Sequence, residues 1–336
     1  MSTKSKRRFI NYKTLIGLVI SGMGLYLGFR KFEMADFFAA LKQTHLGLFL
    51  LAMLVMVFNV YLRAIRWRYL VLPLQQIPLK HLFGAEMICY FGNNVFPLRL
   101  GEVLRAYSLS KVSSLSAISV FGTIVVERLL DVVFFLIILV AAVLLYPTLP
   151  GFIKWSGVVA GLVLFIFIAF YLLLQWQQAA LKKYFNHKLA ANRFHKLFVP
   201  LRLFLQGIRT FRNTPHRLLI IFWTVVIWLM SIFVYWLIGT SLQVFFSIQN
   251  LLLIFIVTSV IISVPSAPGY VGTYHAGAIA MLVYLGYELT QAQVIAVILH
   301  AVGFISLTLV GLIYFLKYQI HVEATALEKL PIENDY

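Results

Sequence analysis

The sequence predicts an all-α, polytopic integral membrane protein. Hydrophobic residues make up 62% of its 336 residues and charged residues only 12%, against about 25% charged residues in a soluble domain. The hydrophobic residues form segments of spanning length, and two of these segments contain matched proline and glycine interruptions. We expect about six spanning helices and two oppositely oriented re-entrant helical hairpins in an inverted repeat. They would form one transmembrane domain over 1–320, followed by a cytoplasmic tail over 321–336.

Six apolar segments are long enough to cross a hydrocarbon core, which needs about 20 helical residues. The N-terminus before the first of them is basic and resembles a signal peptide, but no small-residue cleavage site follows, so we expect a retained span. The third segment is longer than needed, and its start is expected to lie along the cytoplasmic interface or to tilt. The predicted spans are 13–30, 46–64, 115–146, 153–175, 217–239 and 291–317.

Two further apolar segments, about 80–108 and 249–287, are interrupted by proline and glycine. Proline removes a backbone donor and glycine weakens a helix, while lipid offers no partner for a freed backbone group. Matched interruptions in the two halves of the chain indicate discontinuous helices around a central site. The interrupting residues are Pro97 and Gly101 in the first segment and Pro265, Pro268, Gly269 and Gly272 in the second.

Loop charges predict the orientation in the cell membrane. The net charge is +17, but the basic residues lie between apolar spans and therefore indicate orientation and contact with anionic lipid, not nucleic acid. The largest basic block, 182–217, contains no acidic residue, whereas the connections 147–152 and 240–248 carry no charge. The positive-inside rule places the basic regions and both termini in the cytoplasm. A basic amphipathic stretch, about 176–216, is expected to lie in the cytoplasmic interface, as a structural elbow or a lipid-binding helix.

This orientation makes the first broken segment enter and leave from the cytoplasm and the second from outside. The order span, broken segment, span then occurs twice with opposite orientation. The alternative is that each broken segment is a pair of ordinary short spans. The first half of the first segment, 82–96, is about 22 Å of helix against a core of about 30 Å, which favours re-entrant hairpins.

Ionisable residues inside membrane segments are costly and are therefore functional candidates. Arg99, Glu102 and Arg105 follow the first break at three-residue intervals, which places them on or near one helix face. Either an arginine binds phosphate while Glu102 positions it, or the three form an ion-pair cluster without a ligand. Asn93 and Asn94 are expected to satisfy backbone groups freed at the break, with ligand contact secondary.

A second group, Glu127, Arg128 and Asp131, lies within the third span. The two carboxylates are one turn apart on one helix face, and Arg128 lies about 100° away. These residues either line the same polar site or form an ionic lock between helices. The candidate partners of that lock are Arg63, Arg99 and Arg105.

The second break is followed by His275. A half-helix that starts there would present free N–H groups and a partial positive charge to an anion, and the N-termini at Gly101 and Gly272 would supply such donors. His275 would add a proton or a donor, or it is simply a satisfied polar residue. His300 is a weaker candidate, and Trp67 is assigned to an interfacial aromatic belt. No motif for a catalytic residue, a metal or a cofactor is present, and none is expected.

At these motifs the chain resembles the family of the transmembrane region of lysyl-phosphatidylglycerol synthase, whose members are also called flippase-like or UPF0104-type membrane proteins. The similarity covers about 10–320. Many relatives have Pro-Gly-Gly and a glutamate where this chain has Tyr270 and His275. The matching motifs are Asn94 to Arg105, Glu127 to Asp131, and Pro265 to His275.

The resemblance implies translocation of a phospholipid or polyprenyl-linked lipid across the cytoplasmic membrane. In two-part members a cytosolic domain attaches lysine to phosphatidylglycerol, and this chain is expected to correspond to the flippase part alone. The expected partners are membrane lipids, anionic or phosphate-bearing, with no nucleic acid and with a homo-oligomer as an option. The rival functions are an enzyme or accessory protein in lipid-linked glycan or aminoacyl-phospholipid metabolism, a small-solute or ion transporter, and a scaffold.

Overall fold

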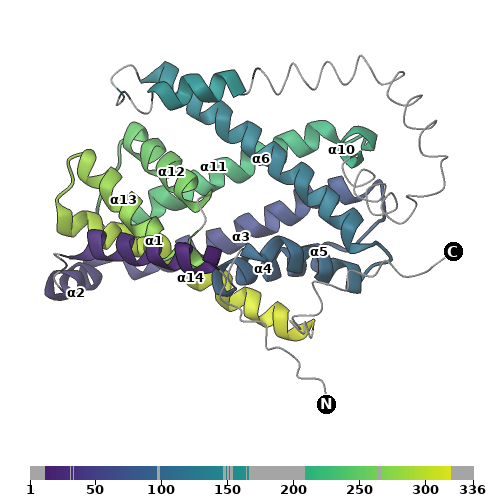
Figure 1. The fold of residues 1–336 in the computed structure, drawn as a ribbon, viewed down its shortest axis with the longest axis horizontal. Helices are drawn as coiled ribbons and strands as arrows, with labels where there is room; N and C mark the ends of the chain where they lie inside the picture. Colours follow the sequence, from purple (N-terminus) through teal and green to yellow (C-terminus); the bar gives the residue numbers. More distant parts are fainter. Residues whose placement is uncertain are drawn as a thin grey trace. The chain divides into compact units, whose positions relative to one another are not determined.

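The computed structural model describes residues 12–30, 32, 34–96, 99–146, 149, 151, 154–163, 165, 209–263 and 266–318. Within these ranges the regular secondary structure is helical, and no strand occurs (Figure 1). This confirms the predicted all-α class. The tail 321–336 and most of the predicted interfacial stretch 176–216 lie outside the described residues.

The helices follow the chain in two series. The first comprises α1 (Tyr12–Phe29), α2 (Met34–Gln43), α3 (Leu46–Val71), α4 (Leu79–Val95), α5 (Gly101–Lys111) and α6 (Ala117–Leu145). The second comprises α10 (Thr210–Asn213), α11 (Arg217–Ser241), α12 (Ile248–Ser263), the 3-10 turn η2 (Pro268–Tyr270), α13 (Thr273–Tyr284) and α14 (Leu289–Lys317).

Four of the described helices, α3, α6, α11 and α14, are long and apolar enough to cross a membrane. They correspond to four of the six predicted spans. The predicted span 13–30 coincides with α1, of which the part Val19–Phe29 is a shorter apolar helix. The predicted span 153–175 lies largely outside the described residues, although 154–163 are helical. The helix α2 was not expected, because its charges suggested a loop.

Both predicted broken segments are divided into two shorter helices. The first consists of α4 and α5, and the second of α12 and α13, with η2 in the interruption. The second helix of each pair has 11 or 12 residues. At 1.5 Å per residue these helices are about 17 and 18 Å long, well short of a hydrocarbon core of about 30 Å. The order long helix, broken pair, long helix therefore occurs twice in the chain.

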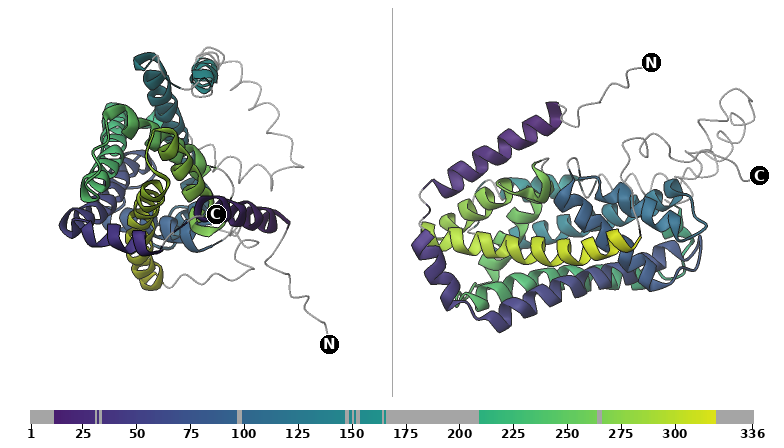
Figure 2. Two further views of the ribbon diagram at one scale, coloured as in Figure 1. Left: turned by 90° about the vertical axis from the view of Figure 1, so that its left-hand side faces the viewer. Right: turned by 90° about the horizontal axis from the view of Figure 1, so that it is seen from below.

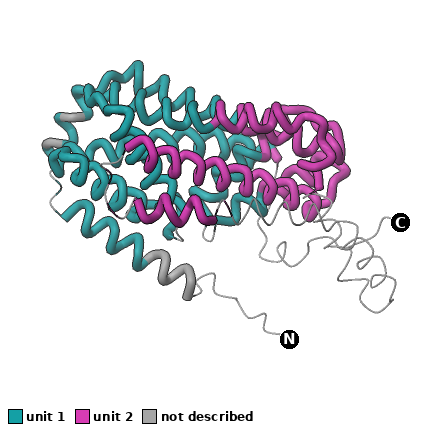
Figure 3. Tube along the Cα trace, turned by 90° about the horizontal axis from the view of Figure 1, so that it is seen from above, with its two compact units in different colours: residues 1–61, 86–104, 228–317 teal, residues 62–85, 105–227, 318–336 magenta. Residues whose placement is uncertain are grey.

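The chain forms two compact units (Figure 3). Unit 1 comprises residues 1–61, 86–104 and 228–317, and unit 2 comprises 62–85, 105–227 and 318–336. The helices α3, α4, α5 and α11 contribute residues to both units. Both helix interruptions belong to unit 1, whereas the ionisable residues of α6 belong to unit 2.

In unit 1, α13 packs against α1, α12 and α14 (Figure 2). Polar contacts fix α1 to the second broken segment and to α14. Ser21 Oγ accepts a hydrogen bond from the N–H of Ala267 at 2.8 Å, and Gln293 Nε2 donates to the carbonyl oxygen of Gly28 at 2.7 Å. A Cβ atom on Gly272 would overlap the carbonyl oxygen of Ser21, so only glycine permits this approach.

Unit 2 is built around an apolar cluster that draws on α3, α4, α5, α6 and α11. Its largest member, Trp67, is completely buried. The assignment of Trp67 to an interfacial belt was therefore wrong, because its ring packs inside the protein. The helix α6 is capped by Ser116, whose side chain accepts the N–H of Ser119 at 3.2 Å, a common way to satisfy a helix N-terminus.

The first interruption depends on glycine where α5 begins. A Cβ atom on Gly101 would overlap the carbonyl oxygen of Cys89, and one on Gly92 would lie 2.9 Å from the Cα atom of Gly101. The start of α5 is thus pressed against the backbone of α4, closer than any side chain allows.

We predict that Gly101→Ala destabilises the protein by about 1–3 kcal/mol, the usual range for overpacking, because the clash is with backbone atoms that cannot turn away. Thermal unfolding of the purified protein in detergent, followed by tryptophan fluorescence, measures this loss. The matched control is Gly22→Ala, since no atom lies within 4 Å of the added Cβ. Equal unfolding midpoints for the two variants would contradict the close approach.

Candidate functional site

Two asparagine side chains form the hydrogen bonds of the first interruption, one to its backbone and one to α14. The amide oxygen of Asn93 accepts the N–H of Gly101 at 2.9 Å, and Nδ2 of Asn94 donates to Oγ1 of Thr308 on α14 at 2.8 Å. The expected structural role of Asn93 is thereby confirmed. The N–H of Gly101, expected as a donor to a ligand, is occupied by Asn93 in this structure.

Two histidines form hydrogen bonds with backbone groups at the second interruption. Nδ1 of His275 accepts the N–H of Gly272 at 3.3 Å, and Nε2 of His300 lies 2.6 Å from the carbonyl oxygen of Gly269. Since a carbonyl oxygen only accepts, that nitrogen of His300 carries the proton. The two rings are 4.7 Å apart between centroids. His275 is buried, with 7% of its surface exposed, and from the third position of α13 it caps the start of that helix.

The two interruptions lie in contact within unit 1. The guanidinium carbon of Arg99 is 4.8 Å from the centroid of the Tyr270 ring, and a Cβ on Gly269 would lie 3.3 Å from the carbonyl oxygen of Asn94. The sequence suggested that the interruptions form one site, and these contacts bring them together.

Arg99 and Tyr270 also share an unusual backbone conformation. Their φ angles are 53° and 61°, in the left-handed region that costs a side-chain-bearing residue about 1–2 kcal/mol. Residues held in this region are concentrated at functional sites. One such residue stands in each interruption, and their side chains stack on each other.

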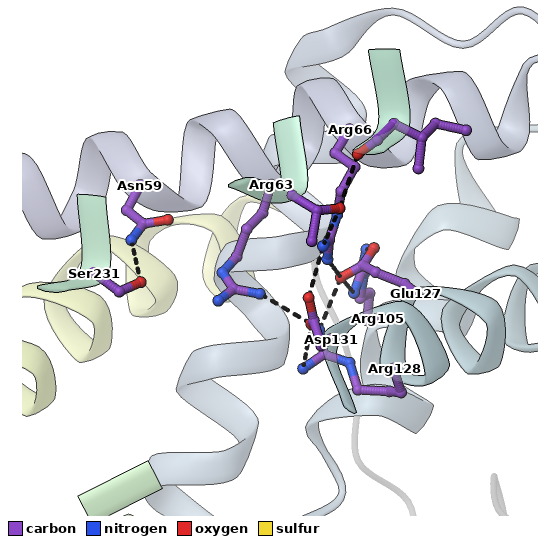
Figure 4. A network of polar contacts seen from close by, with 10 residues as sticks. Asn59, Arg63, Arg66, Arg105, Glu127, Arg128, Asp131 and Ser231 are labelled. Atoms are coloured by element: carbon purple, nitrogen blue, oxygen red, sulfur yellow. Dashed lines mark hydrogen bonds and ion pairs between the residues drawn. The ribbon is translucent and has the colours of Figure 1, made fainter. Parts of the chain in front are cut away.

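Glu127, in unit 2, is the centre of an ionic network (Figure 4). Its two oxygens accept NH1 and NH2 of Arg105 at 3.2 and 2.7 Å. Oε1 also lies 3.2 Å from NH2 of Arg66 and 2.8 Å from NH2 of Arg128. Three guanidinium groups therefore share one carboxylate.

Asp131, one turn further along α6, extends this network. NH1 of Arg66 donates to Oδ1 at 2.6 Å, and NH1 of Arg63 donates to Oδ2 at 3.2 Å. NH1 of Arg128 lies 3.6 Å from Oδ2. Arg66 thus bridges the two carboxylates, and it also donates to Oγ1 of Thr224 on α11 at 3.2 Å.

Burial makes this network costly to disturb. The side chains of Arg66, Arg105 and Glu127 have no exposed surface. The guanidinium of Arg105 also lies 3.8 Å from the centroid of the Trp67 ring, and Nε1 of Trp67 donates to Thr123 at 2.9 Å. Removing one partner of a buried pair leaves an uncompensated charge and typically costs about 3–5 kcal/mol.

The structure separates the three ionisable residues that follow the first interruption, Arg99, Glu102 and Arg105. Arg105 joins Glu127 in unit 2, whereas Arg99 stacks on Tyr270 in unit 1. Glu102 lies half-buried in the first turn of α5. Pro268 begins η2, while Pro97 and Pro265 lie outside the described residues.

Sequence reasoning missed the central position of Arg66. Arg63 was considered only as a candidate partner in an ionic lock, and Arg66 was not singled out. The available signal was their position inside a long apolar helix, three residues apart on one face. Among the described residues, no group of three or more His, Cys, Asp or Glu is arranged to hold a metal ion.

We predict that Glu127→Gln lowers the free energy of unfolding by about 3–5 kcal/mol, because three arginines lose the same negative charge. Thermal unfolding in detergent tests this. Glu288→Gln, at an exposed glutamate, is the control and should change stability by less than about 0.5 kcal/mol. A Glu127→Gln variant as stable as the control would show that the network contributes nothing to the fold.

Comparison with known proteins places the chain in a family. The profile of the family described as "Lysylphosphatidylglycerol synthase TM region" matches residues 14–311. A "UPF0104 membrane protein" from Methanothermobacter thermautotrophicus is 24% identical over 276 residues, which are 75% of this chain and 79% of that protein. No solved structure matches. The family match includes both interruptions and the ionic network, and the chain therefore belongs to the family of the lysylphosphatidylglycerol synthase transmembrane region.

Proposed function

We propose that this protein is a lipid translocase that moves the phosphate-bearing head group of a lipid across the cytoplasmic membrane. One observation carries the proposal: the two helix interruptions meet, and they bring a cation, amide groups and backbone carbonyls together in an otherwise apolar chain. Polar groups at membrane depth are expensive and mark substrate pathways.

Arg99 is the residue that we assign to the phosphate. Its guanidinium carbon lies 4.8 Å from the centroid of the Tyr270 ring, and phosphate is recognised by the N–H groups of a guanidinium. We propose that the contact with Tyr270 orients the guanidinium before a head group arrives. Glu102, three residues after Arg99 and in the first turn of α5, would hold that arginine when no phosphate is bound and let the head group leave.

The helix lengths support a re-entrant arrangement. Helices of about 17 and 18 Å, such as α5 and α13, do not cross a core of about 30 Å. Each broken pair is then a hairpin that enters and returns on one side, α4 and α5 from the cytoplasm and α12 and α13 from outside. By the positive-inside rule we expect the basic loops, and with them both termini, to lie in the cytoplasm.

In this arrangement the head group passes along the interruptions while the acyl or prenyl chains stay in the bilayer. Freed backbone groups line such a path only where the protein itself satisfies them. The hydrogen bonds of Asn93, His275 and His300 to backbone groups supply that condition. We further propose that no covalent step is involved, since binding and release of the head group suffice for translocation.

The proposal predicts that Arg99→Ala and Glu102→Ala slow translocation about tenfold or more, since losing one charge-assisted hydrogen bond of 1.5–3 kcal/mol has this effect. The assay follows quenching of a fluorescent phospholipid in vesicles that contain the purified protein. Arg68→Ala, at an exposed arginine near the end of α3, controls for loss of charge alone. Unchanged rates in both test variants would refute this assignment.

Tyr270 provides a second test, because its stacking role does not need its hydroxyl group. Tyr270→Phe keeps the aromatic face and should translocate lipid at nearly the wild-type rate, whereas Tyr270→Leu should be several-fold slower. Both variants retain a side chain at a positive φ, so backbone strain is matched. Equal rates for the two would mean that the stack does not position Arg99.

A further inference from the structure

The helix α2 lies in unit 1 where two long apolar helices have their ends. His45, two residues after α2, donates its N–H to the carbonyl oxygen of Ser241, the last residue of α11, at 2.7 Å. Nε2 of Gln243 donates to the carbonyl oxygen of Gln43, the last residue of α2, at 3.3 Å. The helix α3 begins at Leu46, so the end of α11 and the start of α3 meet beside α2. Since both helices are long and apolar enough to cross a membrane, these adjoining ends mark one membrane surface.

The helix α2 runs across this surface and does not continue a span. It packs on α14 and, in dark purple in Figure 2, runs crosswise to α14 and to the start of α3. Its 10 residues make about 15 Å of helix, half of a hydrocarbon core of about 30 Å. A short helix that lies crosswise at the ends of spans is at the depth where lipid head groups meet acyl chains.

Aromatic contacts fix which side of α2 faces the protein. The ring centroid of Phe37 lies 5.5 Å from that of Phe32, which lies 5.2 Å from that of Phe29 at the end of α1. Phe29 in turn lies 5.5 Å, between centroids, from His275 of the second interruption. Phe37 and Leu41, one turn apart on α2, are both half-buried. Since this side is held by the protein, the side that α2 turns outward is fixed as well.

The outward side of α2 is apolar. Met34 and Phe38, one turn apart, are 59% and 54% exposed. Exposed apolar side chains continue at four-residue spacing from the first residue of α3, at Leu46, Leu50 and Leu54. On a helix that crosses a membrane such a row is covered by lipid. The apolar side of α2 therefore leads directly into a surface that the bilayer covers, which identifies the bilayer as its occupant.

We propose that α2 is an interfacial lipid-binding helix, whose Met34 and Phe38 side chains enter the boundary between head groups and acyl chains. Lys42, exposed in the last turn and four residues after Phe38, reaches from the same side toward the lipid phosphates. Gln43 lies about 140° around the helix from Phe38 and faces water. The partner is the bilayer surface itself, so the inference goes beyond the proposed function and does not depend on translocation.

The test attaches an environment-sensitive fluorophore to single cysteines of the full chain in nanodiscs of phosphatidylcholine and phosphatidylglycerol. Cys89, the one cysteine of the sequence, is buried, so the wild-type protein is the labelling blank. The quenchers are a nitroxide on the lipid head group, a nitroxide deep in the acyl chain, and aqueous iodide. We expect Phe38→Cys to lose most fluorescence to the head-group nitroxide. The controls are Leu54→Cys, about 12 Å along α3 from its start, for the deep nitroxide, and Gln43→Cys for iodide.

Three results would overturn the proposal. Iodide quenching at Phe38→Cys equal to that at Gln43→Cys would put the apolar side in water. Shielding of Phe38→Cys from all three quenchers would assign this side to another protein surface, such as a second copy of the chain. Deep quenching equal to that at Leu54→Cys would make α2 part of a span. Met34→Cys, on the same side of α2, repeats the measurement if Phe38→Cys does not fold. Because no lipid movement is measured, a failed translocation assay would refute the proposed function and leave this inference standing.

Discussion

Unit 1 depends on one constraint: a backbone group freed inside a membrane must find its partner in the protein. Each helix interruption meets this demand with side chains from nearby in the sequence and from distant helices. Asn93 and His275 accept the N–H groups at the two new helix starts. From other helices, Ser21 accepts a backbone N–H and His300 donates to a backbone carbonyl. These contacts hold α1, α13 and α14 together, so the interruptions organise the packing around them.

Unit 2 depends on a different kind of contact, ion pairs between buried charged side chains. Hydrophobic association adds little between helices in lipid, and polar contacts and close packing decide which helices meet. Glu127 and Asp131 gather arginines from α3, α5 and α6, and Thr224 brings in α11 through Arg66. The same groups thus connect α3, α5, α6 and α11 within unit 2.

The sequence predicted the helical class and both interruptions because composition, segment length and proline–glycine spacing act locally. It also singled out Glu127 and Asp131, since carboxylates in an apolar helix are conspicuous. It did not predict Arg66 as the bridge, because pairing between residues 65 positions apart depends on how helices pack. Trp67 was assigned wrongly for the same reason, because the sequence around an aromatic residue near a helix end is the same whether its ring faces lipid or the protein core. The left-handed backbone of Arg99 and Tyr270 had no sequence signal, as neither is glycine.

The cap on α13 bears on comparison with other members of the family. His275 occupies the third position of that helix and accepts the N–H of Gly272 through Nδ1. A glutamate at the third position of a helix accepts the same N–H in the reciprocal arrangement called a capping box, and many relatives are expected to carry glutamate here. A glutamate in place of His275 would therefore keep the start of α13 capped and would add a carboxylate to the interruption. The cap on the helix depends on an acceptor at this position, whereas a negative charge there depends on which residue supplies the acceptor.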